Sequence, residues 1–426
     1  MLPLFLTLLL AQSPAGETVS VRTLAPSGVR LLLCPRPDGN TVAIAAGFRI
    51  GSAFDGAATC GCAHLLEHVM LFRGTELSGY EDVARRWREL GAQPSGSTYP
   101  DYTLFKASVP KDGVGRALEL LREMLLHPGF SVSDLARERK VVIAELATLE
   151  QDPLLQAYRF ATQALYGEHN YGLPGFGYPR VLEEISATTL YSRFDSEYTP
   201  GRITLALVGP VTEDAVRRAL EETFGTYRLG KTAAPEVGEL PPIEPGPPLV
   251  GTSPAPLAQL VFAFRGPPSG SKDWLPFVVM ARILCGGEGS RLRERLVHQD
   301  GIAKNVSLVA EPRVGGGFAL FRVQLAPELI GRCEREVRRI LARLAERPLD
   351  PAVVERVTNR LRLEFAQRTE SPEALASELV SWDMLSTWSF PLAIREELAR
   401  VTMEQVSRVG QLYFAPAKAK VVTVVP

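Results

Sequence analysis

Alternating and continuous apolar runs predict several short strands in the first quarter of the chain. Val19–Arg22, Arg30–Leu33 and Val42–Arg49 are rich in aliphatic residues and are separated by turn residues, and Thr103–Val109 follows the same pattern. Strands of this length, bounded by glycine, proline and asparagine, are typical of a sheet with one buried face. The pattern therefore predicts a sheet built early in the chain.

Between and after these strands, apolar residues recur at helical spacing. Residues 63–76, Tyr80–Leu90, Val114–Leu126 and Ser133–Leu149 each place apolar side chains three to four positions apart. Strands and helices alternate without a regular parallel-sheet rhythm. We therefore expect an α+β fold in which an antiparallel sheet carries helices on one face.

A proline-rich stretch divides the chain. Residues 230–248 contain prolines at a density that excludes a helix or a central strand, so they read as a semi-rigid linker. We expect an N-terminal domain over residues 16–229 and a C-terminal domain over residues 249–426, because 426 residues exceed what one core usually serves.

The second half resembles the first. Leu126–Pro153 is similar to Glu346–Pro372 with an offset near 219, which places Glu145 on Glu364. The sequence Tyr-Thr-Pro at residues 198–200 likewise recurs as Tyr-Phe-Ala-Pro at residues 413–416, each ahead of an apolar strand. We expect two homologous domains, of which the second is a degenerate copy.

Composition excludes some classes of protein. The chain is 46% hydrophobic and 22% charged with a net charge of −1, so it lacks the basic excess of a nucleic-acid-binding protein.

Residues 2–11 form a short apolar run followed by small residues, which predicts a signal peptide over residues 1–15 and a periplasmic or secreted protein without a transmembrane segment. Cys60 and Cys62 are either an auxiliary metal or redox pair or, as we favour, buried loop residues.

The strongest chemical signal lies in the helix predicted over residues 63–76. Only five histidines occur in the chain, and His64 and His68 are four apart on this helix, with Glu67 between them. Residues four apart lie on one helix face, so both imidazoles can reach one metal ion. Glu67 is one position off that pair, where a carboxylate can take a proton from a zinc-bound water. The alternative is a polar patch on a core helix.

A third ligand is needed, and Glu145 is the best candidate. Glu138 and Glu145 are seven apart on a strongly helical segment, so both carboxylates lie on one face. One could bind the metal while the other orients a ligating histidine. The alternative is a solvated charged face.

These motifs together resemble the insulinase/pitrilysin family of zinc metallopeptidases, close to mitochondrial processing peptidase and its short bacterial relatives. The family carries H-x-x-E-H and then a glutamate ligand, and here 76 residues separate His68 from Glu145. The segments Arg73-Gly-Thr and Tyr198-Thr-Pro are also family-like. The resemblance implies one zinc ion per chain bound by His64, His68 and Glu145, with Glu67 as general base and Glu138 as the carboxylate that orients a ligand.

The chain departs from the family at substrate-binding positions. Where the family carries an arginine and a tyrosine that hold substrate, this chain has Val297 and Lys304. Where the family has Asn-Ala, it has Ser95-Gly96. The resemblance implies either a weak or altered peptidase or, as we favour, a homologous partner subunit that supplies the Arg/Tyr pair.

The sequence therefore predicts a zinc endopeptidase that cleaves peptides or unfolded segments in a cleft between its two domains. A non-catalytic scaffold subunit of the same fold is the main alternative, and a zinc hydrolase of non-peptide substrates is another. The retention of all four residues, His64, Glu67, His68 and Glu145, favours the enzyme.

Overall fold

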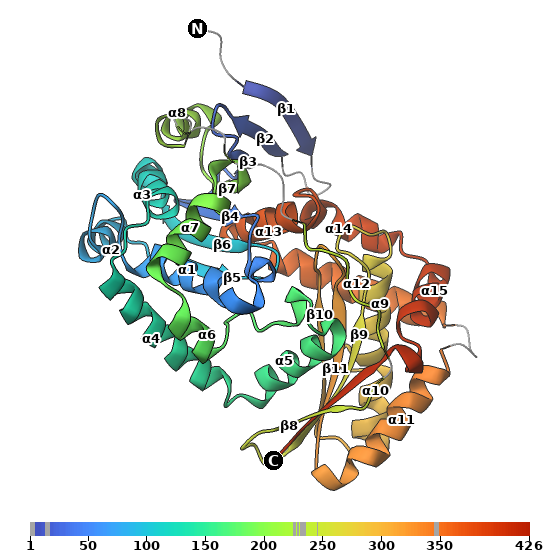
Figure 1. Cartoon of the computed structure of the whole chain (residues 1–426). Helices are drawn as coiled ribbons and strands as arrows, with labels where there is room; N and C mark the ends of the chain where they lie inside the picture. Colours follow the sequence, from blue (N-terminus) through green and yellow to red (C-terminus); the bar gives the residue numbers. More distant parts are fainter. Residues whose placement is uncertain are drawn as a thin grey trace. The chain divides into compact units, whose positions relative to one another are not determined.

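A computed structural model of the chain describes residues 5–12, 18–224, 227, 230, 236–244, 246–344 and 349–426 (Figure 1). Parts of the predicted signal peptide (residues 1–4 and 13–15) and of the predicted linker (residues 231–235 and 245) lie outside these residues. Residues Phe5–Gln12 within the predicted signal peptide form strand β1, which pairs antiparallel with the next strand.

The first compact unit is built on a seven-stranded sheet with the order β1-β2-β3-β7-β4-β6-β5. Strand β4 is buried along almost its whole length, which fits its position inside the sheet. Strand β5 is the last in the order and so forms one edge. The strands after β1 are β2 (Thr18–Leu24), β3 (Arg30–Pro35), β4 (Thr41–Phe48), β5 (Ser95–Thr98), β6 (Thr103–Pro110) and β7 (Ile203–Gly209).

The second compact unit is built on a five-stranded sheet with the order β10-β11-β9-β12-β8. Its central strand β9 and the neighbouring strand β12 are almost completely buried. The strands are β8 (Leu249–Thr252), β9 (Ala258–Arg265), β10 (Asn305–Glu311), β11 (Phe318–Leu325) and β12 (Lys420–Val425).

The two sheets share one topology, which confirms the predicted α+β class with two homologous parts. The order β3-β7-β4-β6-β5 corresponds strand for strand to β8-β12-β9-β11-β10. One pair in each sheet, β3–β7 and β12–β8, is parallel, whereas the sequence pattern predicts antiparallel sheets. A parallel pair needs a long crossover, and the helices between β3 and β7 supply it in the first sheet.

The helices of the first half contain the predicted chemistry. Their bounds agree closely with the sequence pattern for the helices that follow β4 and β6. They are α1 (Cys62–Phe72), α2 (Tyr80–Glu89), α3 (Val114–Leu126), α4 (Val132–Leu149), α5 (Pro153–Tyr166), α6 (Pro179–Glu184), α7 (Ala187–Glu197) and α8 (Glu213–Thr223).

The helices of the second half follow a similar order. The three-residue α10 continues into a π-helix, η6 (Glu294–Gln299). No helix in the described part of the chain is both long enough and apolar enough to cross a membrane. The helices are α9 (Trp274–Cys285), α10 (Arg291–Arg293), α11 (Ile330–Ala342), α12 (Pro351–Arg368), α13 (Pro372–Leu385), α14 (Phe390–Ala399) and α15 (Met403–Tyr413).

The predicted internal repeat is visible in the helix bounds. Adding 219 to both ends of α4 gives the two ends of α12, and adding 219 to both ends of α5 gives the two ends of α13. Glu145 on α4 therefore corresponds to Glu364 on α12. The two segments keep the same helix lengths although most of their residues differ.

The compact units are not contiguous in sequence. The first comprises Met1–Ile143, Gly175–Glu236 and Phe365–Ile394, and the second comprises Ala144–Pro174, Val237–Glu364 and Arg395–Pro426. This division differs from contiguous domains over residues 16–229 and 249–426. Three of the junctions fall inside helices, in α4, α12 and α14.

The non-contiguous division arises because α5 and α13 belong to the sheet of the opposite half. Helix α13 packs against β4 and β7 of the first unit, and α5 packs against β9 and β12 of the second (Figure 1). Glycines allow both approaches: a Cβ on Gly47 of β4 would lie 2.5 Å from Cγ1 of Val380, and a Cβ on Gly251 of β8 would lie 2.3 Å from Cε2 of Phe160. Each helix thus packs directly on sheet backbone.

Buried polar contacts also fix α13 in the first unit. The carboxylate of Asp383 accepts a hydrogen bond from Oγ1 of Thr204 on β7 at 2.7 Å. The guanidinium groups of Arg30 and Arg49 lie 3.0 Å and 3.3 Å from the two oxygens of the same carboxylate. These partners compensate the cost of burying the charge of Asp383.

Candidate metal centre

Helix α1 is buried along its length, although it carries two histidines and a glutamate. All residues from Cys62 to Leu71 are buried, and His64, Glu67 and His68 are only 5%, 6% and 8% exposed. Buried ionisable groups need specific partners to compensate their desolvation. The surroundings of each of these side chains therefore define the site.

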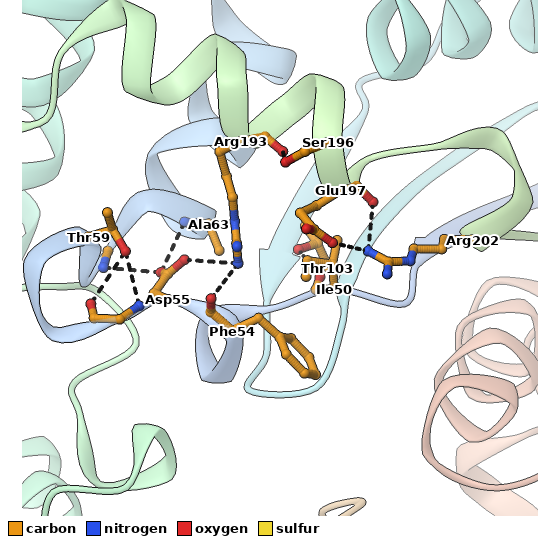
Figure 2. A network of polar contacts seen from close by, with 12 residues as sticks. Ile50, Phe54, Asp55, Thr59, Ala63, Thr103, Arg193, Ser196, Glu197 and Arg202 are labelled. Carbon is orange, nitrogen blue, oxygen red and sulfur yellow. Dashed lines mark hydrogen bonds and ion pairs between the residues drawn. The ribbon is translucent and has the colours of Figure 1, made fainter. Parts of the chain in front are cut away.

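A buried aspartate holds the start of α1. Oδ2 of Asp55 accepts hydrogen bonds from the backbone N–H groups of Gly61 at 3.2 Å and Ala63 at 3.1 Å, which are donors left unsatisfied at a helix start (Figure 2). Arg193 of α7 lies 3.6 Å from Oδ1 of Asp55 and donates to the carbonyl of Phe54 at 2.6 Å. Burial raises the pKa of Asp55 to about 7, while the amides of α1 and Arg193 act in the opposite direction.

The general-base candidate, Glu67, faces the edge strand β5. Oγ1 of Thr98 donates a hydrogen bond to Oε2 of Glu67 at 2.7 Å. A Cβ on Gly96 would lie 2.8 Å from Oε1 of Glu67, so only glycine lets the strand approach the carboxylate this closely. Glu67 is thus held beside the backbone of an edge strand.

His68 is oriented by the second predicted carboxylate. Nδ1 of His68 lies 3.1 Å from Oε2 of Glu138 on α4, and Glu138 is only 1% exposed. A carboxylate accepts hydrogen bonds, so Nδ1 is the nitrogen that donates here, and Nε2 is the nitrogen left to bind a metal ion. The guanidinium of Arg73 binds the other oxygen, Oε1, of Glu138. The chain Arg73–Glu138–His68 thus sets the histidine tautomer that suits a metal ligand.

His64 lies against an aromatic ring and the second histidine. Its ring centroid is 4.8 Å from that of Phe176 and 4.7 Å from that of His68, both in edge-on geometry. Burial, and then the neighbouring His68, lowers the pKa of His64 to about 3. The imidazole is therefore neutral at neutral pH, which is the form that binds metal ions.

Glu145 completes the group. One ligand atom from each of His64, His68 and Glu145 can be chosen so that all lie within 4.8 Å of one another. Two imidazoles and a carboxylate are a ligand set typical of a catalytic zinc site, in which a fourth position stays open. The structure thus brings together all five residues that the sequence analysis selected around α1 and α4.

The predicted Arg/Tyr positions belong to the second unit. Val297 is half-buried within the π-helix η6, and Lys304 is exposed just ahead of β10, where its backbone N–H donates to the carbonyl of Gln324 at 2.8 Å. A valine side chain has no hydrogen-bond donor. The chain itself therefore offers only one charged group, Lys304, at these two positions.

The cysteines are buried thiols. Cys60 and Cys62 are each 1% exposed, and burial, followed by the charge of Asp55, raises the pKa of both to about 12. A protonated thiol is a poor nucleophile and metal ligand. The interpretation of this pair as buried loop residues fits their surroundings.

A second group of possible ligands lies on the surface of the second unit. Glu288, Glu294 and His298 are close enough to share an ion, but two of the three are exposed. The carboxylate of Glu288 also accepts a hydrogen bond from Nε of Arg293 at 2.7 Å. This group lacks the enclosed surroundings of the α1 site.

Sequence reasoning missed Asp55, Arg193 and Phe176. Asp55 had a local signal, since an aspartate shortly before a helix often binds its free N–H groups. Arg193 and Phe176 had none, because they reach α1 from segments more than a hundred residues away.

Comparison with known proteins identifies the family to which this chain belongs. The family model for insulinase (peptidase family M16) matches residues 30–176, and the model for the peptidase M16 inactive domain matches residues 184–361. Together they match most of the chain. The chain belongs to peptidase family M16.

Similar proteins carry the name of zinc proteases. An uncharacterized zinc protease of Bacillus subtilis is 27% identical over 286 residues, covering 67% of this chain and 68% of that protein. An uncharacterized zinc protease of Mycobacterium leprae is 28% identical over 299 residues, covering 70% of this chain and 67% of that protein.

Solved structures show the same fold. The crystal structure of a protease from Helicobacter pylori has a TM-score of 0.89 at 18% identity, covering 96% of this chain and all of that chain. A putative M16-like peptidase from Alicyclobacillus acidocaldarius has a TM-score of 0.83 at 18% identity, with coverage of 100% and 99%. The whole chain thus has the fold of this family.

Proposed function

We propose that this chain is a zinc-dependent endopeptidase that cleaves peptides or unfolded segments. His64, His68 and Glu145 would hold one zinc ion, Glu67 would act as general base and Glu138 would orient His68. The observation that carries the proposal is the convergence of the three ligand atoms within 4.8 Å, beside a buried carboxylate that is not one of them. Membership of family M16 and the zinc-protease names of its relatives support it.

The protein groups have distinct roles in this mechanism. A zinc ion at this site would polarise the scissile carbonyl and lower the pKa of a water molecule. Glu67 takes the proton from the attacking water and passes it to the leaving amine, and Thr98 fixes the carboxylate by its hydrogen bond. Glu138, itself bound by Arg73, holds Nδ1 of His68, so Nε2 would be the nitrogen that binds the metal.

The edge strand β5 is the proposed substrate platform. An extended peptide can add to an exposed strand edge through main-chain hydrogen bonds. Because β5 ends the first sheet and Gly96 lies directly against Glu67, a peptide paired with β5 would pass beside the general base. This binding mode depends on backbone shape, which suits unfolded segments of varied sequence.

The test combines metal analysis with cleavage of an unstructured, internally quenched peptide. We expect one zinc per chain, and the substitution Glu67→Gln should reduce the cleavage rate by about 10²–10⁴-fold while zinc content is unchanged. Glu81→Gln on the exposed start of α2 is the matched control and should leave both unchanged. Absence of zinc from the purified protein would contradict the proposed enzyme and favour a non-catalytic scaffold subunit.

We further propose that a homologous partner subunit supplies the arginine and tyrosine missing here. The support is the pair Val297 and Lys304, which cannot together replace a guanidinium and a phenol. We expect zinc binding by the chain alone but efficient cleavage only after mixing with a homologue that carries the pair. Full cleavage by the chain alone would show that no partner is needed.

We also propose export to the periplasm or the cell exterior, on the basis of the apolar run at residues 2–11. N-terminal sequencing of protein recovered from the periplasmic fraction tests this. A cytoplasmic protein that retains Phe5 would contradict it.

A further inference from the structure

A small pocket lies in the second unit between α9 and α12. It has a volume of about 80 Å³ and is lined by three arginines, Arg282, Arg356 and Arg360, by the glycine-rich loop at residues 286–290, and by Glu364. Helix α12 is the repeat of α4, and Glu364 is the residue that corresponds to Glu145. The pocket therefore lies beside the copy of the ligand glutamate.

Two of the three arginines bind Glu364, and the third, Arg356, has no side-chain partner in the part of the chain that the structure describes. Arg282 donates to Oε2 of Glu364 at 2.9 Å, and Nε of Arg360 donates to Oε1 of the same carboxylate at 3.1 Å. Among the described residues, Arg356 has neither a hydrogen bond nor an ion pair from its side chain. Its guanidinium lies against the loop, since a Cβ on Gly289 would be 3.6 Å from one of its terminal nitrogens.

A buried hydroxyl lines the same pocket. Ser290 is only 3% exposed, and its Oγ has no hydrogen-bond partner within the described part of the chain. Leaving a buried hydroxyl unpaired is costly, so its persistence indicates a ligand that accepts a hydrogen bond. The carboxylate of Glu288 also lines the pocket, but Arg293 binds it at 2.7 Å.

We propose that this pocket binds the C-terminal carboxylate group of a peptide. The guanidinium of Arg356 would bind the two oxygens, and the hydroxyl of Ser290 would donate to one of them. One unpaired guanidinium matches a monoanion, and the carboxylates of Glu288 and Glu364 disfavour a dianion such as phosphate. That a peptide carries the group rests on the proposed peptidase function, whereas the carboxylate chemistry rests on the pocket alone.

The test measures binding to the full-length metal-free chain, which cannot cleave by the proposed mechanism. The probes are trialanine with a free C-terminal carboxylate, the same peptide with an amidated C-terminus, and inorganic phosphate. Isothermal titration calorimetry measures the affinity of each probe. We expect the free acid to bind about 10-fold more tightly than the amide, because a charge-assisted contact is lost. Arg356→Gln and Ser290→Ala should each remove that preference.

Arg335→Gln on α11 is the matched control, since Arg335 is also exposed but does not line the pocket. It should leave the preference unchanged. Equal binding of acid and amide, a preference that survives Arg356→Gln, or binding of phosphate without the free acid would each overturn the proposal. Loss of peptide cleavage in the zinc-loaded protein would bear on the proposed function alone, because these titrations contain no metal.

Discussion

The glutamate that repeats in α4 and α12 has different partners in the two halves of the chain. In the first copy, Glu145 of α4 lies with the imidazoles of His64 and His68 of α1. In the second, Glu364 of α12 binds the guanidinium groups of Arg282 of α9 and Arg360 of its own helix. Two imidazoles and a carboxylate form a ligand set that suits a divalent cation, whereas a carboxylate between two arginines already has positively charged partners.

The two halves also differ at the position of the carboxylate that orients His68. The position that corresponds to Glu138 is occupied by Val357 in the second copy. A valine cannot hold a histidine tautomer, and no histidine is present there to be held. The second copy has thus lost the ligands and their support together but has kept the glutamate, which has become part of an ion-pair network.

The largest expected effect comes from changing the equivalent glutamates in turn. Glu145→Ala should abolish zinc binding and cleavage, because two imidazoles alone make an incomplete site. Glu364→Ala should leave zinc content and cleavage within about twofold and lower stability by less than about 1 kcal/mol, since its arginine partners reach solvent. Metal analysis, cleavage assays and urea unfolding measure these effects. Equal loss of zinc in both variants would refute the division of roles.

A smaller effect is expected from the orienting position. Glu138→Gln should weaken zinc binding by about 10–100-fold, because the hydrogen bond that orients His68 becomes weaker. Competition with a chelator of known affinity gives the change. The reverse substitution, Val357→Glu, should create no zinc site in the second copy, and zinc bound there would mean that the missing histidines are not what separates the copies.

The two close helix approaches offer a matched test of packing. Gly47→Ala would force a methyl group onto Val380 of α13, and Gly251→Ala would force one onto Phe160 of α5. Each should reduce the free energy of unfolding by about 1–3 kcal/mol, the usual cost of overpacking. Gly115→Ala, where nothing lies within 4 Å of the added methyl group, is the control and should not destabilise. An unchanged free energy of unfolding in both glycine variants would show that these helices can move away from the sheets without cost.

A pH-dependent effect is expected from the aspartates at the starts of α1 and α9. Asp55 is bound by Arg193 of α7, and Asp273 is bound by Arg408 of α15. Because burial raises the folded-state pKa of Asp55 from 3.8 to about 7, the folded chain holds more protons between these values and its stability falls as pH rises through them. The slope from this group should be at most about 1.4 kcal/mol per pH unit.

Asp55→Asn keeps a side-chain oxygen for the helix amides and should remove this slope. Urea unfolding of the metal-free protein from pH 4 to pH 7 measures it, with Asp273→Asn as the matched variant at the other helix. If the two stability curves for wild type and Asp55→Asn run parallel, burial does not shift the carboxylate as stated.

Local patterns are enough to predict much of the fold and the site. The strand predicted over Val42–Arg49 is observed as β4, Thr41–Phe48, because aliphatic runs between turns are a short-range signal. His64, Glu67 and His68 follow from helical spacing, and Glu145 follows from family resemblance and the spacing within α4. The repeat offset near 219 in the sequence equals the offset that separates α4 from α12 and α5 from α13.

Contacts between distant segments are not predictable in the same way. The pairing of Asp55 with Arg193 and the packing of Phe176 on His64 depend on how the chain returns to α1, which no local pattern specifies. The exchange of α5 and α13 escapes prediction for a related reason. An apolar helix face shows that a helix is buried but not which sheet buries it.

The exchanged helices have a practical consequence for anyone who divides this protein into fragments. A cut in the proline-rich stretch would give an N-terminal piece whose strands β4 and β7 lack α13 and the buried partner of Thr204, and a C-terminal piece whose strands β9 and β12 lack α5. Each piece would expose an apolar sheet surface that invites aggregation. If either fragment fails to fold, the missing exchanged helix would be sufficient to explain the failure. Co-expression of both pieces restores each helix to its sheet and is therefore the appropriate starting point for separating the two halves.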